Sequence, residues 1–157
     1  MTSYTGGCQC GAVRFRVKGA LKDASICHCR MCQKAFGNFF APLVNTKGTD
    51  FEWTRGTPKA FQSSNVVKRG FCADCGTPLY YDAPDGLAMA VGAFDHPEQL
   101  KPVIQFGVEG KISWCDELPA LPARVTEEDL EAAPFLSDII SYQHPDHETD
   151  QWPEQGE

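Results

Sequence analysis

The segment Phe71-Cys72-Ala73-Asp74-Cys75-Gly76-Thr77-Pro78-Leu79 decides how this chain folds. A Cys-x-x-Cys-Gly turn places two thiolates on one side of a tight loop, and its glycine permits the positive φ that such a turn needs. This spacing is typical of a zinc knuckle. Because zinc held by thiolates takes four ligands in a tetrahedron, the segment predicts that two more cysteines come to it from elsewhere in the chain.

The pair Cys8-Gln9-Cys10 can provide those two ligands. In an extended segment, residues two apart project from the same face, so both thiols can bind one ion. The resulting set of Cys8, Cys10, Cys72 and Cys75 joins segments more than sixty positions apart. Metal binding that closes so long a loop contributes directly to folding. We therefore predict a structural zinc at these four residues.

A second cluster, Cys27-His28-Cys29-Arg30-Met31-Cys32, has three sulfurs and no obvious fourth ligand. His28 is expected to point away from Cys27 and Cys29, which suits a buried supporting role better than ligation. Three protein ligands with an open position are typical of a catalytic zinc, so Cys27, Cys29 and Cys32 are predicted both to bind metal and to form the catalytic centre. Three thiolates on a dication leave a net charge of about −1, which favours holding a substrate thiol as thiolate over making hydroxide.

Other interpretations of these residues stay open at this point. A disulfide between Cys8 and Cys10 would be strained. The Cys27–Cys32 cluster can instead be a redox thiol set or a vestige without metal. Cys115 is most simply a small buried apolar residue beside Trp114. Three aromatic residues after the second cluster belong either to the core or to the walls of a small cleft: Phe36, Phe39 and Phe40.

Composition and charge limit the classes of function that this chain can have. The 157 residues suit one domain, with 42% hydrophobic and 22% charged residues. A net charge of −7 argues against a nucleic-acid partner. No apolar run is long enough to cross a bilayer, so no membrane partner is expected. The N-terminal residues lack the features of a secretory signal, so we expect a cytoplasmic protein whose cysteines stay reduced. The oligomeric state stays open.

Short alternating or β-branched runs separated by turn signals predict a mainly β fold of small antiparallel sheets. The expected strands lie at 13–17, 39–44, 51–54, 66–71, 79–81 and 87–91. Residues 1–125 are predicted to form the zinc-binding domain. Thr126 before three acidic residues indicates a helix N-terminus, so residues 126–142 are expected to be a short helical extension. Residues 143–157 are expected to be a flexible acidic tail.

The order of the three cysteine motifs resembles the glutathione-dependent formaldehyde-activating family, which includes the centromere protein V domain. The motifs that carry the resemblance are Gly6–Gly11, Cys27–Cys32 and Phe71–Leu79, and the likeness extends to about Pro122. The resemblance implies a tent-like fold stapled by zinc, with one four-cysteine structural ion and one three-cysteine catalytic ion. It also implies carbon–sulfur lyase chemistry, in which glutathione adds to formaldehyde to give S-hydroxymethylglutathione.

One position departs from the family pattern. Members often carry a histidine about nine residues before the tryptophan, where this chain has Gln105. Glutathione also needs cations for its two carboxylates, and four residues are candidates, although each can equally be a surface charge: Lys34, Arg55, Lys68 and Arg69.

We therefore expect a zinc-dependent carbon–sulfur lyase that joins or separates a small glutathione-like thiol and an aldehyde. The alternative is a non-catalytic, zinc-stapled protein-interaction module. A thiol-redox enzyme is a third possibility, in which the cysteines of the second cluster would form a reversible disulfide.

Overall fold

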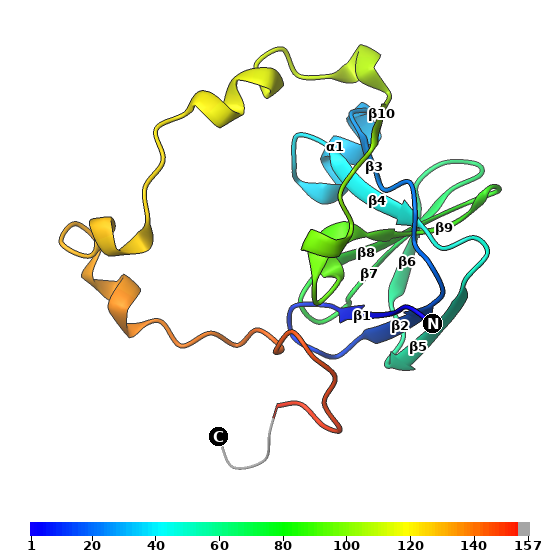
Figure 1. Ribbon diagram of the computed structural model, residues 1–157, viewed down its shortest axis with the longest axis horizontal. Coiled ribbons are helices and arrows are strands. Elements are labelled where there is room, and N and C mark those ends of the chain that lie inside the picture. The colour runs from blue at the N-terminus through cyan, green and yellow to red at the C-terminus, as the bar shows by residue number, and fades with distance from the viewer. Residues whose placement is uncertain (154–157) are drawn as a thin grey trace.

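The computed structural model describes residues 1–153, which form two β-sheets (Figure 1). The smaller sheet has the order β1-β2-β5, and the larger has the order β10-β3-β4-β9-β8-β7-β6. All neighbouring strands are antiparallel except β10 and β3, which are parallel. The strands are β1 (Ser3–Gly7), β2 (Arg14–Lys18), β3 (Ser25–Cys27), β4 (Ala41–Asn45), β5 (Asp50–Arg55), β6 (Lys59–Gln62), β7 (Lys68–Phe71), β8 (Pro78–Ala83), β9 (Gly86–Ala90) and β10 (Ile104–Phe106).

The helical elements are short. One α-helix, α1 (Arg30–Phe36), has Cys29 as its N-cap and Gly37 as its C-cap, and the φ of 57° at Gly37 is the left-handed conformation that glycine favours at a helix end. The remaining helical elements among the described residues are 3₁₀ turns: η1 (Val91–Ala93), η2 (Pro97–Gln99), η3 (Val108–Gly110), η4 (Cys115–Ala120), η5 (Thr126–Asp129) and η6 (Pro134–Asp138). None of the helices in residues 1–153 is both long and apolar enough to cross a bilayer.

The core lies between the two sheets. Phe15 and Val17 of β2 are fully buried and pack in one cluster with Val44, Leu79 and Met89 of the larger sheet. The period of two in β2 explains this, because alternate side chains of a strand point to the same face. A group of aromatic rings closes one end of the cluster around Phe15, namely Phe51, Trp53 and Phe94. The prediction of a mainly β fold with small antiparallel sheets is confirmed.

The expected strands are present, but four strands and the helix have no clear sequence signal. β1, β3, β6 and β10 have three to five residues each. Elements this short show too few residues for a periodic pattern to stand out. They form because neighbouring strands provide hydrogen-bonding partners.

Arg14 of β2 is a charged residue buried beside the core. The residue is only 4% exposed, and its guanidinium donates two hydrogen bonds to the carboxylate of Asp95, at 2.9 and 2.6 Å. Thr5 also donates to this carboxylate. Burial of the charge is tolerated because its partner is buried with it and both are hydrogen-bonded.

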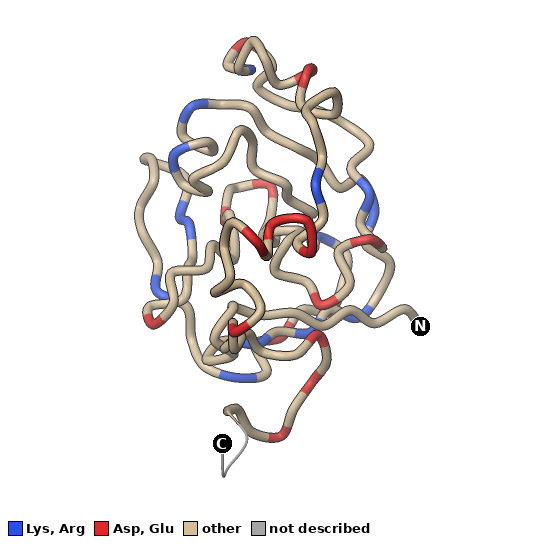
Figure 2. The backbone as a smooth tube through the Cα atoms, turned by 90° about the vertical axis from the view of Figure 1, so that its left-hand side faces the viewer, with Lys and Arg blue, Asp and Glu red and all other residues tan. Residues whose placement is uncertain are grey.

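Residues 111–142 form a segment that we call the arm. It leaves the body after β10, runs outward as an open loop and returns near β1 (Figure 1). Residues 126–142 were expected to form a short helical extension. Their helical elements are the 3₁₀ turns η5 and η6 and not an α-helix. Most of the chain's net charge of −7 lies here, since the arm has seven carboxylates and two basic residues. Figure 2, in which this side faces the viewer, shows acidic positions in front of the body.

Residues 143–153 contact the body, which differs from the flexible tail expected for this stretch. His144 is 3% exposed and donates its backbone N–H to the carbonyl of Gln9 at 2.7 Å. Arg16 bonds the carboxylate of Glu148, and Arg55 donates to the carbonyl of Thr149. Sequence composition missed these contacts because each joins the tail to a residue about a hundred positions away. The last part of the expected tail, residues 154–157, lies outside the described residues.

Candidate metal centres and active site

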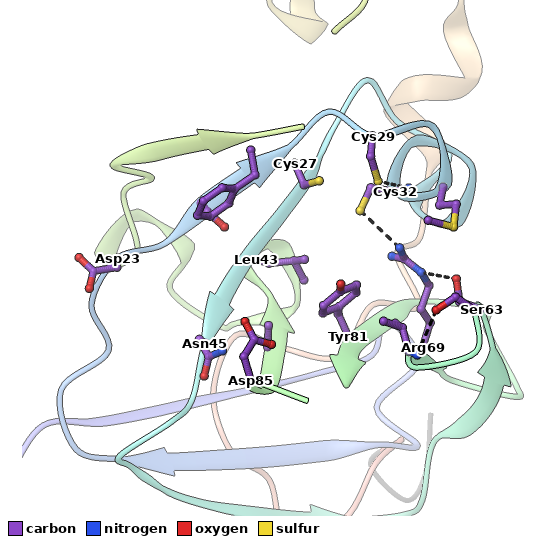
Figure 3. Close-up of a pocket in the computed structure, with 16 residues that line it drawn as sticks. Asp23, Cys27, Cys29, Cys32, Leu43, Asn45, Ser63, Arg69, Tyr81 and Asp85 are labelled. Atoms are coloured by element: carbon purple, nitrogen blue, oxygen red, sulfur yellow. Dashed lines mark hydrogen bonds between the residues drawn. The ribbon is translucent and has the colours of Figure 1, made fainter. Parts of the chain in front are cut away.

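The predicted trio Cys27, Cys29 and Cys32 comes together at the junction of β3 and α1. Its three sulfur atoms all lie within 4.8 Å of one another. Cys27 ends β3, and Cys29 is the N-cap of α1, where its sulfur accepts the backbone N–H of Cys32 at 3.3 Å. A strand that ends two residues before a helix therefore turns all three sulfurs toward one point (Figure 3).

Arg69 is the cation beside this trio. It is 7% exposed, and its Nη2 donates to the sulfur of Cys32 at 3.4 Å, while its Nε donates to the hydroxyl of Ser63 at 2.9 Å. The guanidinium also lies over the ring of Tyr81, 5.0 Å from the centroid. Its Nη1 is buried without a hydrogen-bond partner among the described residues. Of the four candidate cations for glutathione, Arg69 is the one that contacts the trio.

The thiols of the trio differ in acidity. Burial raises the pKa of Cys32 to about 12, although the hydrogen bond and charge of Arg69 act in the opposite direction. Burial likewise raises the pKa of Cys27. At Cys29, burial raises the pKa, but the Cys32 N–H, the neighbouring thiols and the charge of Arg69 together bring it below its ordinary value. Cys29 is therefore the thiol of the trio that ionises first.

Residues behind the trio hold its backbone. His28 is 1% exposed and its Nε2 lies 2.8 Å from Oε1 of Gln105. The buried side chain of Gln33 donates to the carbonyl of His28 at 2.8 Å and to that of Gly110 at 3.0 Å. Gly107 has a φ of +61°, and a Cβ there would lie 3.0 Å from the backbone nitrogen of Cys29. His28 thus has the supporting position expected of it, and Gln105 at the divergent family position is its partner.

Sequence reasoning missed Gln33 and gave Gln105 no structural role. A single glutamine in a helix carries no signal, and β10 reaches β3 only through a parallel pairing in the folded chain. The sequence signal that could have indicated this contact is the pair Gly107 and Gly110, because two glycines soon after a short strand indicate that another backbone segment comes close.

A cavity of about 430 Å³ opens beside the trio (Figure 3). That volume lies in the range of small-molecule sites. Its lining combines apolar and polar side chains with one basic and two acidic residues: Asp23, Ser25, Cys27, Cys29, Met31, Cys32, Leu43, Asn45, Ser63, Ser64, Val67, Arg69, Tyr81, Asp85, Ala88 and Phe106.

Phe36, Phe39 and Phe40, left open by the sequence as core or cleft residues, do not line this cavity. Phe36 packs against the core, the ring of Phe40 contacts His28, and Phe39 contacts Trp114. The walls come instead from residues of β4, β7, β8 and β10 that only the sheet brings together. Cys115 is also corrected, because it is half-buried in a 3₁₀ turn and not a core residue.

The remaining candidate cations do not line this cavity. Lys34 is exposed on α1, and Lys68 is exposed on β7. Arg55 is engaged by the backbone of Gly11 and Thr149, which fastens the tail.

The second group consists of Cys8, Cys10, Cys72 and Cys75, whose sulfurs also lie within 4.8 Å of one another. The sulfur of Cys10 is 3.6 Å from that of Cys8 and 3.8 Å from that of Cys72. Cys72 and Cys75 lie in the expected turn, in which Gly76 has a φ of +80°. Cys8 and Cys10 follow β1 in a turn and not in the extended segment expected, yet both sulfurs still face the knuckle.

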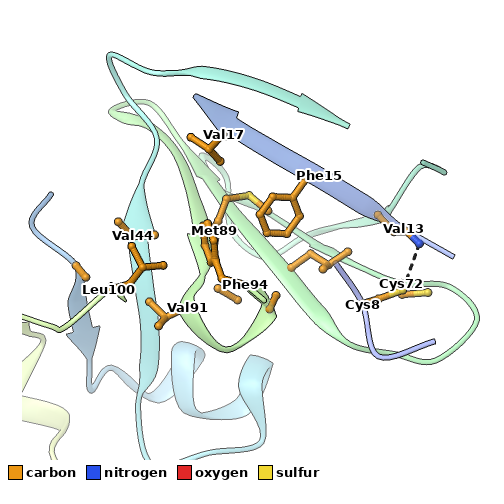
Figure 4. Close-up of a cluster of buried hydrophobic side chains, with 14 residues drawn as sticks. Cys8, Val13, Phe15, Val17, Val44, Cys72, Met89, Val91, Phe94 and Leu100 are labelled. Carbon is orange, nitrogen blue, oxygen red and sulfur yellow. Dashed lines mark hydrogen bonds between the residues drawn. The ribbon is translucent and has the colours of Figure 1, made fainter. Parts of the chain in front are cut away.

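Backbone donors surround this group. Val13 donates its N–H to the sulfur of Cys8 at 3.2 Å, and Asp74 donates to that of Cys72 at 3.4 Å. Figure 4 shows Cys8 and Cys72 at the end of the cluster that contains Phe15 and Met89. Burial raises the pKa of Cys10 to about 12, whereas at exposed Cys75 the hydrogen bonds of Thr77 outweigh partial burial and bring the pKa to about 6.

Fold and site together define a class of protein: a small β protein with two clusters of cysteines able to hold metal ions, one at the end of the core and one beside a cavity. A sequence model described as glutathione-dependent formaldehyde-activating enzyme matches residues 3–109, and the chain belongs to this family. The resemblance drawn from the cysteine motifs is thereby confirmed. The match ends just before the arm.

The two individual proteins compared next each share less than 30% sequence identity with this chain. An uncharacterized lyase of Schizosaccharomyces pombe is 29% identical over 86 residues, which are 55% of this chain and 62% of the relative. The match therefore spans less than two thirds of that protein. A crystal structure of a Rhodobacter sphaeroides protein aligns with a TM-score of 0.49 and 24% identity, covering 64% of this chain and 98% of the other.

Proposed function

We propose that this protein is a zinc-dependent carbon–sulfur lyase that forms and cleaves adducts between a glutathione-like thiol and a small aldehyde. The observation that carries the proposal is the trio of Cys27, Cys29 and Cys32 at the wall of a cavity large enough for a small molecule. The family and the lyase-named relative support a lyase of this kind. Eight cysteines without a disulfide are also compatible with the cytoplasm, which we propose as its location.

Both thiol groups fit zinc by their chemistry. Zinc–sulfur bonds of about 2.3 Å in a tetrahedron put the sulfurs about 3.8 Å apart. The sulfur of Cys10 lies at 3.6 and 3.8 Å from its two measured neighbours. N–H donors point at Cys8, Cys72 and Cys29, as is suitable for thiolates. The two groups differ in the number of sulfur ligands that they offer, which is four in one and three in the other.

The role of zinc at Cys27, Cys29 and Cys32 would be to hold a substrate thiol in its nucleophilic thiolate form. The protein's own residues then determine where the second substrate lies. Leu43, Val67 and Phe106 provide an apolar wall that excludes water, and Tyr81 lines the cavity beside Arg69, whose guanidinium lies over its ring.

Arg69 is the residue we assign to the aldehyde oxygen. Its Nη2 is committed to Cys32 and its Nε to Ser63, which leaves the buried Nη1 to donate to a substrate. Arg69 lines the cavity and one edge of its guanidinium contacts a sulfur of the trio, so the guanidinium is placed between the cavity and the thiols that would hold the substrate. A fixed cation there stabilises the negative charge that develops on the oxygen.

The reaction balances without an oxidant. The thiolate attacks the carbonyl carbon, a C–S bond forms, and the C=O π pair moves to the oxygen beside Arg69. The alkoxide then takes a proton from water or from the phenol of Tyr81, which lines the cavity and is protonated at neutral pH as tyrosines ordinarily are. Cleavage runs through the same steps in reverse and returns free thiol and aldehyde.

The direct test is NMR of glutathione and ¹³C-labelled formaldehyde, in which exchange between free and adduct carbon is measured with and without protein. We expect the zinc-loaded protein to accelerate exchange, and a chelator or Cys29→Ala to remove the effect. A panel of small thiols and aldehydes extends the test to other substrates. If no pair exchanges faster and the protein binds only one zinc, the chain is a zinc-stapled interaction module.

A further inference from the structure

The arm, residues 111–142, is held to the body at its two ends. At one end, Gly110 accepts a hydrogen bond from the side chain of Gln33, which lies on α1. At the other end, the backbone of His144 bonds Gln9. From Cys115 to Tyr142, the hydrogen bonds within residues 1–153 join arm residues to each other or to Gln143.

The arm exposes a large apolar surface. Six of its aliphatic and aromatic side chains are between 60% and 83% exposed: Leu121, Val125, Phe135, Ile139, Ile140 and Tyr142. A set of large apolar side chains this exposed marks an interaction surface. The same segment has a net charge of −5, from seven carboxylates against Lys111 and Arg124. A surface that suits the arm must therefore be apolar and basic.

The body has a surface of this kind in a groove between α1 and β6 of about 390 Å³. Exposed Met31 and Phe61 form its apolar part, at 55% and 63% exposure. Arg30 and Lys34 provide exposed positive charge, buried Arg69 also lines the groove, and no acidic residue lines it. β6 is an edge strand of the larger sheet, so nothing within residues 1–153 pairs with its outer side.

We propose that the arm of one chain docks in the α1–β6 groove of a second copy, and that the protein is a reciprocal dimer. The complementarity of an acidic, apolar arm and a basic, apolar groove supports a partner with this chain's own chemistry. The arm of the same chain leaves the body beside α1 and runs away from it (Figure 1). Two identical arm–groove contacts related by a two-fold axis close the assembly.

The dimer also affects the site. Met31, Ser63 and Arg69 line both the groove and the cavity beside the cysteine trio. An arm seated in the groove therefore lies at the mouth of that cavity, and each site is completed by the partner chain. The dimer itself does not depend on the proposed reaction and is tested without it.

The test uses light scattering coupled to size exclusion on the zinc-loaded full chain. The unaltered protein is expected to be a dimer. An arm variant, Phe135→Asp with Ile139→Asp, and a groove variant, Phe61→Asp with Lys34→Glu, should each raise the dimer Kd by about 100-fold or more. Lys18→Glu adds the same negative charge as the arm variant at the exposed end of β2, away from the groove, so it is the control for added negative charge and should stay dimeric.

Mixing the two variants distinguishes arm–groove docking from a dimer that forms through a different surface. A heterodimer of the arm variant and the groove variant keeps one intact contact, formed by the groove variant's arm in the arm variant's groove. Mixing the two monomers should therefore restore dimers that neither forms alone, and added salt should weaken them. A monomeric unaltered protein, a dimer that tolerates both variants, or a mixture that stays monomeric would each overturn the proposal.

Discussion

At the scale of single residues, the eight cysteines are alike in sequence but differ in environment. Cys8, Cys32 and Cys72 are buried, whereas Cys75 is exposed. Four lie where distant turns meet, and three lie at one strand–helix junction beside a cavity. Their expected roles follow from these positions, since ligands that join distant segments stabilise the fold and ligands beside a cavity can meet a substrate.

Alanine substitutions at Cys75 and Cys29 should therefore have different effects. Cys75→Ala removes a ligand of the proposed structural zinc. The binding free energy of such an ion, about 10–16 kcal/mol in small zinc domains, matches or exceeds that of folding, so we expect the variant to unfold. Cys29→Ala loses turnover but only about 1 kcal/mol of helix capping, a decrease in Tm of about 2–4 °C. Circular dichroism melts with zinc content measure both. Equal destabilisation would show that the division of labour is wrong.

Arg69 provides a second prediction at this scale. Arg69→Met removes the proposed donor to the aldehyde oxygen, and the rate of adduct exchange should fall about 100-fold. Lys68→Met changes the same charge on the exposed neighbour in β7 and should leave the rate unchanged. Zinc content and the Tm are measured for both variants. If Arg69→Met loses the zinc at the trio, then Arg69 supports the metal site and does not act on the substrate.

The buried pair Arg14–Asp95 predicts a pH-dependent stability. Burial raises the pKa of Asp95, but hydrogen bonds and charge from Arg14 and Thr5 outweigh it and hold the value below 3.8. The pair therefore stabilises the fold above about pH 4 and loses its effect as pH falls through the folded-state pKa.

Urea unfolding of Asp95→Asn tests this expectation. The variant should be less stable by about 3 kcal/mol at pH 7, and the difference from the unaltered protein should shrink toward pH 3. Glu52→Gln breaks the exposed pair with Arg16 and is the matched control, with an expected loss of less than about 1 kcal/mol. Comparing the two variants at each pH cancels the effect of zinc release in acid.

At the scale of elements, contacts over long sequence distances shape the molecule. Cys29 of the trio is the N-cap of α1, β10 pairs in parallel with β3 beside the trio, and residues 143–153 pack on the turn that contains Cys10. A Cβ at Gly11 would lie 2.5 Å from the ring of His144, so a side chain there would displace the tail.

The docking of this tail should weaken in acid. Burial and the charges of Arg14 and Arg55 lower the pKa of His144 below 6.5. Because the docked state disfavours the charged imidazole, docking is fully stable above about pH 6.5 and weakens as pH falls through the lowered pKa. Hydrogen exchange of residues 143–153, followed by mass spectrometry from pH 7.5 to 5.5 and corrected for intrinsic rates, should show increasing opening.

His144→Ala should produce the same opening at pH 7.5, with exchange about tenfold faster because roughly 1–2 kcal/mol of packing and hydrogen bonding is lost. The control His147→Ala removes an exposed imidazole from the same tail and should retain protection. Unchanged protection in His144→Ala would mean that the other tail contacts suffice.

At the scale of the whole molecule, the two proposed ions should leave in sequence. The trio borders an open cavity, whereas the four-cysteine group has two buried ligands at the end of the core. A mild chelator should therefore remove one zinc per chain and abolish exchange with little loss of structure. A strong chelator should remove the second and unfold the domain. Zinc release followed by a colorimetric indicator, with circular dichroism in parallel, distinguishes this order from simultaneous release.

The sequence by itself determined the mainly β class, the two groups of cysteines and the family. These follow from local chemistry, because a Cys-x-x-Cys-Gly turn and a period of two are expressed within a few neighbouring residues. The tertiary structure alone decided that Arg69 lies at the trio, that Gln105 pairs with His28, and that Arg14 is buried against Asp95. Each of these joins residues 37 to 81 positions apart, and only the packing of strands determines which of many charged or polar side chains meet.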